Sequence, residues 1–139
     1  MLIPLDLQQY QPQLSIKREA GITYLYDPVR KNWLVLQPEE LVRQLMLCHL
    51  IAELGYKASH LQTERGLKVH QQQNRRTDIL AFDREIRPFL LVECKAPQVK
   101  LDEKTFWQAV HYNQALHAPF IVVTNGLQTY CCRVAERRL

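Results

Sequence analysis

Residues 75–97 read RRTDILAFDREIRPFLLVECKAP, and this stretch decides the fold. Its two short apolar runs, ILAF and FLLV, are typical of central strands that are covered on both faces. The polar segment between them ends in Pro88, a residue that suits the start of a strand. The stretch therefore predicts an antiparallel hairpin with its loop at residues 84–87 and Asp83 opposite Pro88.

The register of this hairpin predicts a group of charged side chains. Counting outward from the loop puts Asp78 opposite Glu93, and side-chain alternation puts Lys95 on the same face. Like charges directly opposite each other are destabilising. Two carboxylates so placed need a cation, unless one of them takes up a proton. The ordinary alternative is a set of solvated groups at strand ends, paired with Lys95 or Arg76.

Length and composition limit the class of protein. The 139 residues suffice for one domain with a sizeable core. No apolar stretch of transmembrane length and no secretory signal is present, so we expect a soluble cytoplasmic protein with no membrane contact. The four cysteines lack a Cys-x-x-Cys spacing, which argues against a zinc ribbon. Lys and Arg exceed Asp and Glu by 18 to 14, a balance that is compatible with nucleic-acid binding.

The order of the predicted elements indicates the fold class. We expect a single domain, 1–139, made of an N-terminal arm (1–21), an accessory hairpin (22–36) and a core (38–135). Within the core, a helix begins at Pro38 and ends near Gly55. Further elements are expected at 61–69 (strand), 79–82 and 89–92 (the hairpin), 103 to about 117 (helix), 120–124 and 128–134 (strands). This order predicts an α/β (α+β) fold, a mixed central sheet flanked by helices.

Several short segments occur in an order that resembles one enzyme superfamily. They are Asp27-Pro28-Val29-Arg30, Pro38-Glu39-Glu40-Leu41-Val42-Arg43-Gln44, Asp78, Val92-Glu93-Cys94-Lys95-Ala96-Pro97, Gln108 with Tyr112, and Thr124-Asn125-Gly126. Over about residues 22 to 130 the chain resembles the PD-(D/E)XK nucleases, and more closely the N-terminal nuclease domain of type I restriction enzyme R (HsdR) subunits. Thr77 replaces the proline of the superfamily name, and no Walker A pattern of an ATP-driven motor is present.

The resemblance implies a restriction-endonuclease-like core (α-β-β-β-α-β) and a metal-dependent DNA endonuclease that hydrolyses phosphodiester bonds. Asp78 and Glu93, helped by the backbone carbonyl of Cys94, would ligate Mg²⁺, with Mn²⁺ as a substitute. Lys95 would orient the attacking water or stabilise the negative transition state. The ordinary interpretation of Lys95 is a salt bridge to Asp78.

The resemblance also assigns roles to residues on the two helices. Glu40 would reach the site through a metal-bound water, with Glu39 as its rival. Gln108 would approach the metal site from the second helix, while Tyr112 is either a contact to the DNA backbone or a half-buried aromatic. The DNA-binding candidates, whose ordinary alternative is a solvated surface for the two basic residues, are Arg76, Lys104 and Tyr112.

Partners and competing functions follow from the same resemblance. DNA is the expected partner, with a motor or specificity subunit and a homodimer as further candidates. The alternative function is a catalytically idle nuclease-fold module for DNA binding or assembly with a restriction or repair partner. A third interpretation is a small α/β domain that binds something other than nucleic acid.

Overall fold

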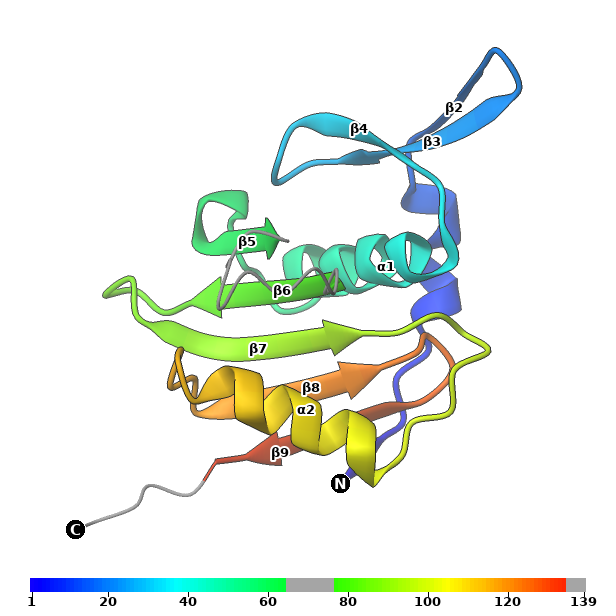
Figure 1. Cartoon of the computed structure of the whole chain (residues 1–139). Coiled ribbons are helices and arrows are strands. Elements are labelled where there is room, and N and C mark those ends of the chain that lie inside the picture. Colours follow the sequence, from blue (N-terminus) through cyan, green and yellow to red (C-terminus); the bar gives the residue numbers. More distant parts are fainter. Residues whose placement is uncertain (65–76, 135–139) are drawn as a thin grey trace, which may run out of the picture.

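A six-stranded sheet forms the centre of the molecule in the computed structural model, which describes residues 1–64 and 77–134 (Figure 1). Its strand order is β1-β9-β8-β7-β6-β5, and only the pair β7–β8 is parallel. The strands are β1 (Leu2–Ile3), β5 (Leu61–Glu64), β6 (Thr77–Phe82), β7 (Pro88–Cys94), β8 (Phe120–Thr124) and β9 (Thr129–Arg133). The predicted mixed sheet is confirmed.

Two α-helices cover the opposite faces of this sheet. On one face, α1 (Pro38–Ala52) buries Leu45 and Leu50 in a cluster with Ile79 and Val92. On the other face, α2 (Glu103–Asn113) buries Ala109 against β8. Short 3-10 helices, η1 (Leu7–Gln13) and η2 (Ala58–His60), complete the set. The layers agree with the predicted restriction-endonuclease-like architecture, and no helix in the described ranges is long and apolar enough to cross a membrane.

The ends of the helices follow local rules. Pro38 stands at the start of α1 with two glutamates in the first turn, where the helix dipole favours negative charge. Asp102 caps α2, since its carboxylate accepts the backbone N–H of Thr105 at 3.0 Å. The predicted end of α2 near residue 117 is wrong. The helix ends at Asn113, whose side-chain amide bonds both backbone groups of Ala118 and so closes the next turn.

A second, three-stranded antiparallel sheet lies at the top of Figure 1. Its strands are β2 (Ile16–Glu19), β3 (Ile22–Asp27) and β4 (Asn32–Val35). The expected accessory hairpin is therefore present, with one more strand than expected. The expectation of an N-terminal arm is wrong: β1 pairs with β9, and η1 packs on α1 through Leu7 and Tyr10, which are 0% and 5% exposed.

The hairpin of β6 and β7 has the predicted register at its open end. The Cα partner of Asp78 is Glu93, as expected. Near the loop the prediction is wrong, because Phe82, and not Asp83, pairs with Pro88 across an irregularity. The Asp83 carboxylate instead accepts the backbone N–H groups of Glu85 and Arg87, so this residue closes the turn.

Candidate active site

Acidic positions form a row across three neighbouring strands. Glu64 of β5 is the Cα partner of Asp78 in β6, and Asp78 is the partner of Glu93 in β7. The side chain of Glu93 is buried, with a relative exposure of 2%. Glu64 was missed by the sequence analysis, because the long connection between residues 64 and 77 leaves the pairing of β5 undetermined.

Lys95 lies directly beside the buried carboxylate. Its Nζ is 3.3 Å from Glu93 Oε2, and its side chain is 30% exposed. The backbone N–H of Lys95 donates to the carbonyl of Thr124 at 2.8 Å, which extends the parallel pairing of β7 and β8. Among the described side chains, Glu93 therefore forms an ion pair with Lys95. Such a pair compensates a carboxylate that would otherwise be buried at high cost.

The site lies on the face of the sheet that α2 covers. Leu91, two residues before Glu93, packs with Leu80 and with Tyr112 of α2. Tyr112 is half-buried there, in agreement with the aromatic alternative for this residue. Gln108 is exposed on the same helix, one turn earlier.

Glu40 belongs to a network within α1, the helix on the other face. Its carboxylate accepts Nε and Nη2 of Arg43, at 2.9 and 2.5 Å, and Nε2 of Gln44, at 3.1 Å. Arg43 and Gln44 are buried, at 3% and 2% exposure. Glu40 thus lies in the first turn of the helix that covers the other face of the sheet. The rival, Glu39, is partly exposed in the same first turn.

The other predicted residues lie at varied places. The side chain of Cys94 is buried on the α1 face, within the main core cluster. Lys104 is exposed in the first turn of α2. Arg76 lies outside the described residues. Among the described side chains, which do not include that of Asp78, no group of three or more His, Cys, Asp and Glu residues could hold a metal ion.

The turn between β8 and β9 holds the segment that follows Lys95. Asn125 donates from Nδ2 to the carbonyl of Val99 at 2.9 Å, and its Oδ1 accepts two backbone N–H groups of the turn. Gly126 has φ +89°, and a Cβ at this position would lie 3.2 Å from Cγ2 of Val42 in α1. The turn thereby ties the Lys95 end of β7 to both β8 and α1.

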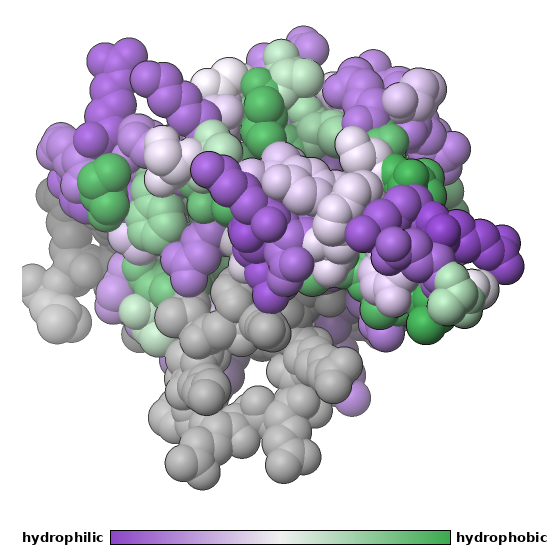
Figure 2. Space-filling view, turned by 90° about the horizontal axis from the view of Figure 1, so that it is seen from above, coloured by the Kyte–Doolittle hydropathy of each residue, from purple (hydrophilic) through white to green (hydrophobic). Residues whose placement is uncertain are grey.

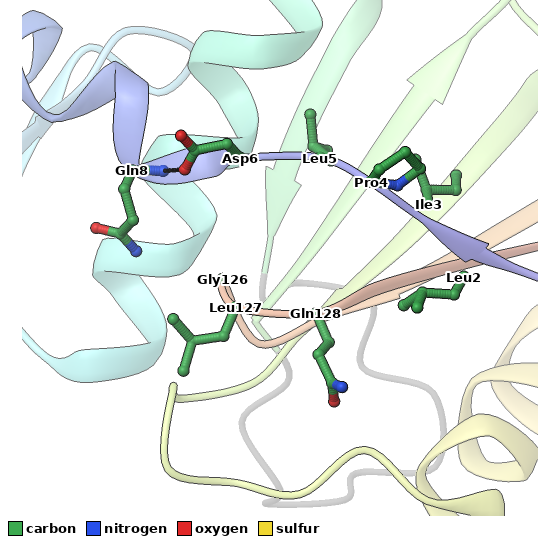
Figure 3. Close-up of a pocket in the computed structure, with 9 residues that line it drawn as sticks. All are labelled: Leu2, Ile3, Pro4, Leu5, Asp6, Gln8, Gly126, Leu127 and Gln128. Carbon is green, nitrogen blue, oxygen red and sulfur yellow. Dashed lines mark hydrogen bonds between the residues drawn. The ribbon is translucent and has the colours of Figure 1, made fainter.

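A pocket of about 440 Å³ lies beside this turn, between the N-terminal segment and β8–β9 (Figure 3). Leu2, Leu5 and Leu127 contribute apolar side chains to its lining. None of the predicted site residues lines this pocket. The pocket is therefore separate from the acidic row.

Asp27 joins the small sheet to the large one. It is fully buried, and its Oδ2 accepts the hydroxyl of Thr63 in β5 at 2.8 Å. Its Oδ1 accepts the backbone N–H groups of Val29 and Arg30. The sequence analysis used Asp27 as part of a motif and of the expected accessory hairpin, since an Asp-Pro pair between two strands is a turn signal, but it missed the contact with the large sheet. Thr63 is the Cα partner of Ile79, which packs with α1, so the small sheet is anchored on the face of the large sheet opposite the acidic row.

The family model of the type I restriction enzyme R protein N terminus (HSDR_N) matches residues 38–138. This chain belongs to that family. The resemblance expected from the motifs is thus confirmed, and the match begins with α1 and spans β5 to β9. The N-terminal segment and the small sheet precede the matched region of this R-protein family. No curated protein matches the chain.

Proposed function

We propose that this member of the R-protein N-terminal family is a metal-dependent DNA endonuclease. The observation that carries the proposal is the pairing of Asp78 with Glu93 on adjacent strands, with Nζ of Lys95 3.3 Å from the Glu93 carboxylate. Two acids and a lysine at the ends of neighbouring strands provide the groups that phosphodiester hydrolysis requires.

The donor set fits a hard divalent cation. Carboxylate and carbonyl oxygens are the ligands that Mg²⁺ prefers, and Mg²⁺ needs few of them because it keeps several waters. The acidic positions 64, 78 and 93 are aligned on adjacent strands. A cation would relieve the repulsion between carboxylates placed in this way.

The proposed roles follow from this placement. Asp78, Glu93 and the carbonyl of Cys94 would hold Mg²⁺ or Mn²⁺, which when bound polarises the scissile phosphate and acidifies a water. Lys95, a third exposed, can turn its ammonium from Glu93 to the negative charge that develops on the phosphate.

The remaining candidates would act around this centre. Gln108 would approach it from α2, and Glu40, or its neighbour Glu39, would act from α1 through a water. Phosphate contacts would come from Arg76, Lys104 and Tyr112. DNA is the proposed substrate, and a motor or specificity subunit, or a second copy of the chain, is the proposed partner.

A second candidate is an idle nuclease-fold module that binds DNA or a restriction partner without cleaving. The burial of Glu93 together with its ion pair to Lys95 favours this candidate, since a substrate has to displace an existing contact. The two candidates differ in metal binding and in turnover.

Plasmid cleavage in Mg²⁺ or Mn²⁺ tests the proposal. Wild type is expected to nick or linearise supercoiled DNA and to stop in excess EDTA. Asp78→Asn and Lys95→Ala should lose cleavage and keep the fold, whereas the exposed control Lys100→Ala should cut normally. DNA binding by wild type without metal binding or cleavage would support the idle module instead.

A further inference from the structure

Strand β5 is a short edge strand of the large sheet, and its last residue belongs to the acidic row. In the part of the chain that the structure describes, this strand pairs only with β6, and the pairing ends with Glu64 opposite Asp78. An edge strand with a single neighbour needs a further contact to keep its register. The contacts that hold β5 therefore decide where Glu64 lies.

Two buried residues of β5 settle which face of the sheet each of its residues occupies. Leu61 is 6% exposed and packs in the core cluster of α1. Thr63 is 2% exposed and donates its hydroxyl to Oδ2 of Asp27 at 2.8 Å. Both residues lie on the α1 face, and positions alternate along a strand. Gln62 and Glu64 therefore belong to the opposite face, as Asp78 does.

The small sheet supports this edge strand from the α1 side. It lies above β5 in Figure 1, and Asp27 at the end of β3 is 0% exposed. The second carboxylate oxygen of Asp27 accepts two backbone N–H groups of the following turn, so the carboxylate is held toward Thr63. Figure 2 views the molecule from above and shows hydrophilic and hydrophobic residues next to each other on this side. A shift of β5 by one residue would break the bond to Asp27 and move Glu64 to the wrong face.

The pairing also sets the spacing of the three acids. Residues directly opposite each other on antiparallel strands have Cα atoms about 4.5–5.5 Å apart. Asp78 stands in the middle of the row, one strand from Glu64 and one strand from Glu93. Glu64 and Glu93 are two strands apart, which corresponds to roughly 10 Å. A cation shared by Asp78 and Glu93 would lie between β6 and β7, and Glu64 is placed one strand farther away.

We propose that Glu64 is a third acid of the cation site and binds the cation through one of its waters. This inference rests on the proposed function, in which Asp78 and Glu93 hold the cation. Mg²⁺ takes few carboxylates and keeps several waters, so an acid one strand beyond Asp78 meets the hydration shell instead of the ion. Groups that orient the ligands of a metal commonly contribute about 10- to 100-fold to its affinity. Glu64 is thus a positioning residue.

Binding of Mn²⁺, followed by the electron paramagnetic resonance signal of the free ion, tests this inference without DNA and without turnover. Glu64→Gln keeps the size of the side chain and should bind Mn²⁺ about tenfold or more weakly than wild type. In EDTA this variant should be no less stable to urea than wild type, because it removes a like charge opposite Asp78. Glu85→Gln, the same exchange in the exposed turn at the other end of the hairpin, should leave the affinity unchanged.

A relocated acid separates the place of Glu64 from its charge. Gln62 lies on the same face of β5, opposite Leu80. Gln62→Glu combined with Glu64→Gln restores the net charge outside the row and should not restore the affinity for Mn²⁺. Full recovery in this double variant would overturn the inference, and so would wild-type affinity of Glu64→Gln while Asp78→Asn loses binding. If wild type itself bound no Mn²⁺, the proposed function would fail and this inference with it.

Discussion

Nζ of Lys95, the residue directly after β7, lies 3.3 Å from Oε2 of Glu93 near the end of that strand. The carboxylate is buried and the ammonium is partly exposed. A buried anion requires a nearby positive charge, so Lys95 has a structural role here beside the proposed catalytic one. A substitution at Lys95 therefore changes both stability and activity, and the two effects must be measured separately.

The first prediction separates these effects with a double-mutant cycle. Lys95→Met leaves the Glu93 carboxylate buried without this partner and should lower the free energy of unfolding by about 1–3 kcal/mol. Adding Glu93→Gln removes the buried charge and should restore part of that loss. Urea unfolding of the four proteins provides the values. Strict additivity of the two substitutions would show that the pair contributes no coupling.

The buried carboxylate of Asp27 should be the main anchor of the small sheet. Asp27→Ala leaves the Thr63 hydroxyl and two backbone N–H groups without their acceptor, at an expected cost of about 2–4 kcal/mol. Thr63→Val removes one of these bonds and should cost about 1 kcal/mol. Thr63→Ser keeps the hydroxyl and serves as the control. An unfolding midpoint of Asp27→Ala equal to that of wild type would show that Asp27 does not anchor the small sheet.

Two glycines with positive φ angles differ in their surroundings. Gly126 (φ +89°) faces Val42 at 3.2 Å, whereas Gly21 (φ +80°) has open space around its added Cβ. Alanine should cost about 1 kcal/mol at either position because of the left-handed backbone, and clearly more at Gly126 because Val42 must move. Thermal unfolding of Gly126→Ala and Gly21→Ala compares them, and equal losses would contradict the close packing of the turn on α1.

Stability should fall on acidification through His49. Its Nδ1 lies 2.9 Å from the Tyr10 hydroxyl, and burial lowers the pKa of His49, partly opposed by the charge of Glu53. The unfolded chain then takes up a proton more readily than the folded one. The stability gained by keeping His49 neutral is therefore complete above about pH 6.5. It is lost as the pH falls toward the pKa of His49 in the folded protein. Comparing urea unfolding of wild type and His49→Asn between pH 5 and 8 isolates it; identical pH profiles would exclude the effect.

The core of the fold was predictable because its signals are local. The short loop between β6 and β7 left one sensible register, and buried runs on both strands put Asp78 opposite Glu93. The irregularity beside the loop was missed because it depends on Asp83, which bonds the turn instead of extending the strand. The pattern of apolar and polar residues does not predict such hydrogen bonds between a side chain and the backbone.

Other parts depended on contacts that the sequence does not specify. The position of Glu64 beside Asp78 depends on the register between β5 and β6. The sequence does not specify that register, because many residues separate the two strands. Strand β2 has a polar sequence, and its two-residue turn, Ala20-Gly21, has positive φ at both positions although alanine seldom adopts it, so little in the sequence indicates this hairpin. The ion pair of Lys95 with Glu93 depends on side-chain packing at the strand end, which alternation does not specify.

A crystal structure of the protein grown with Mg²⁺ tests the central proposal most directly. The account predicts a cation within about 2.0–2.1 Å of carboxylate oxygens of both Asp78 and Glu93, with waters in the remaining positions. Glu93→Gln, treated in the same way, should lose that cation. Well-ordered Asp78 and Glu93 side chains without a cation between them at saturating Mg²⁺ would contradict the proposed metal-dependent nuclease.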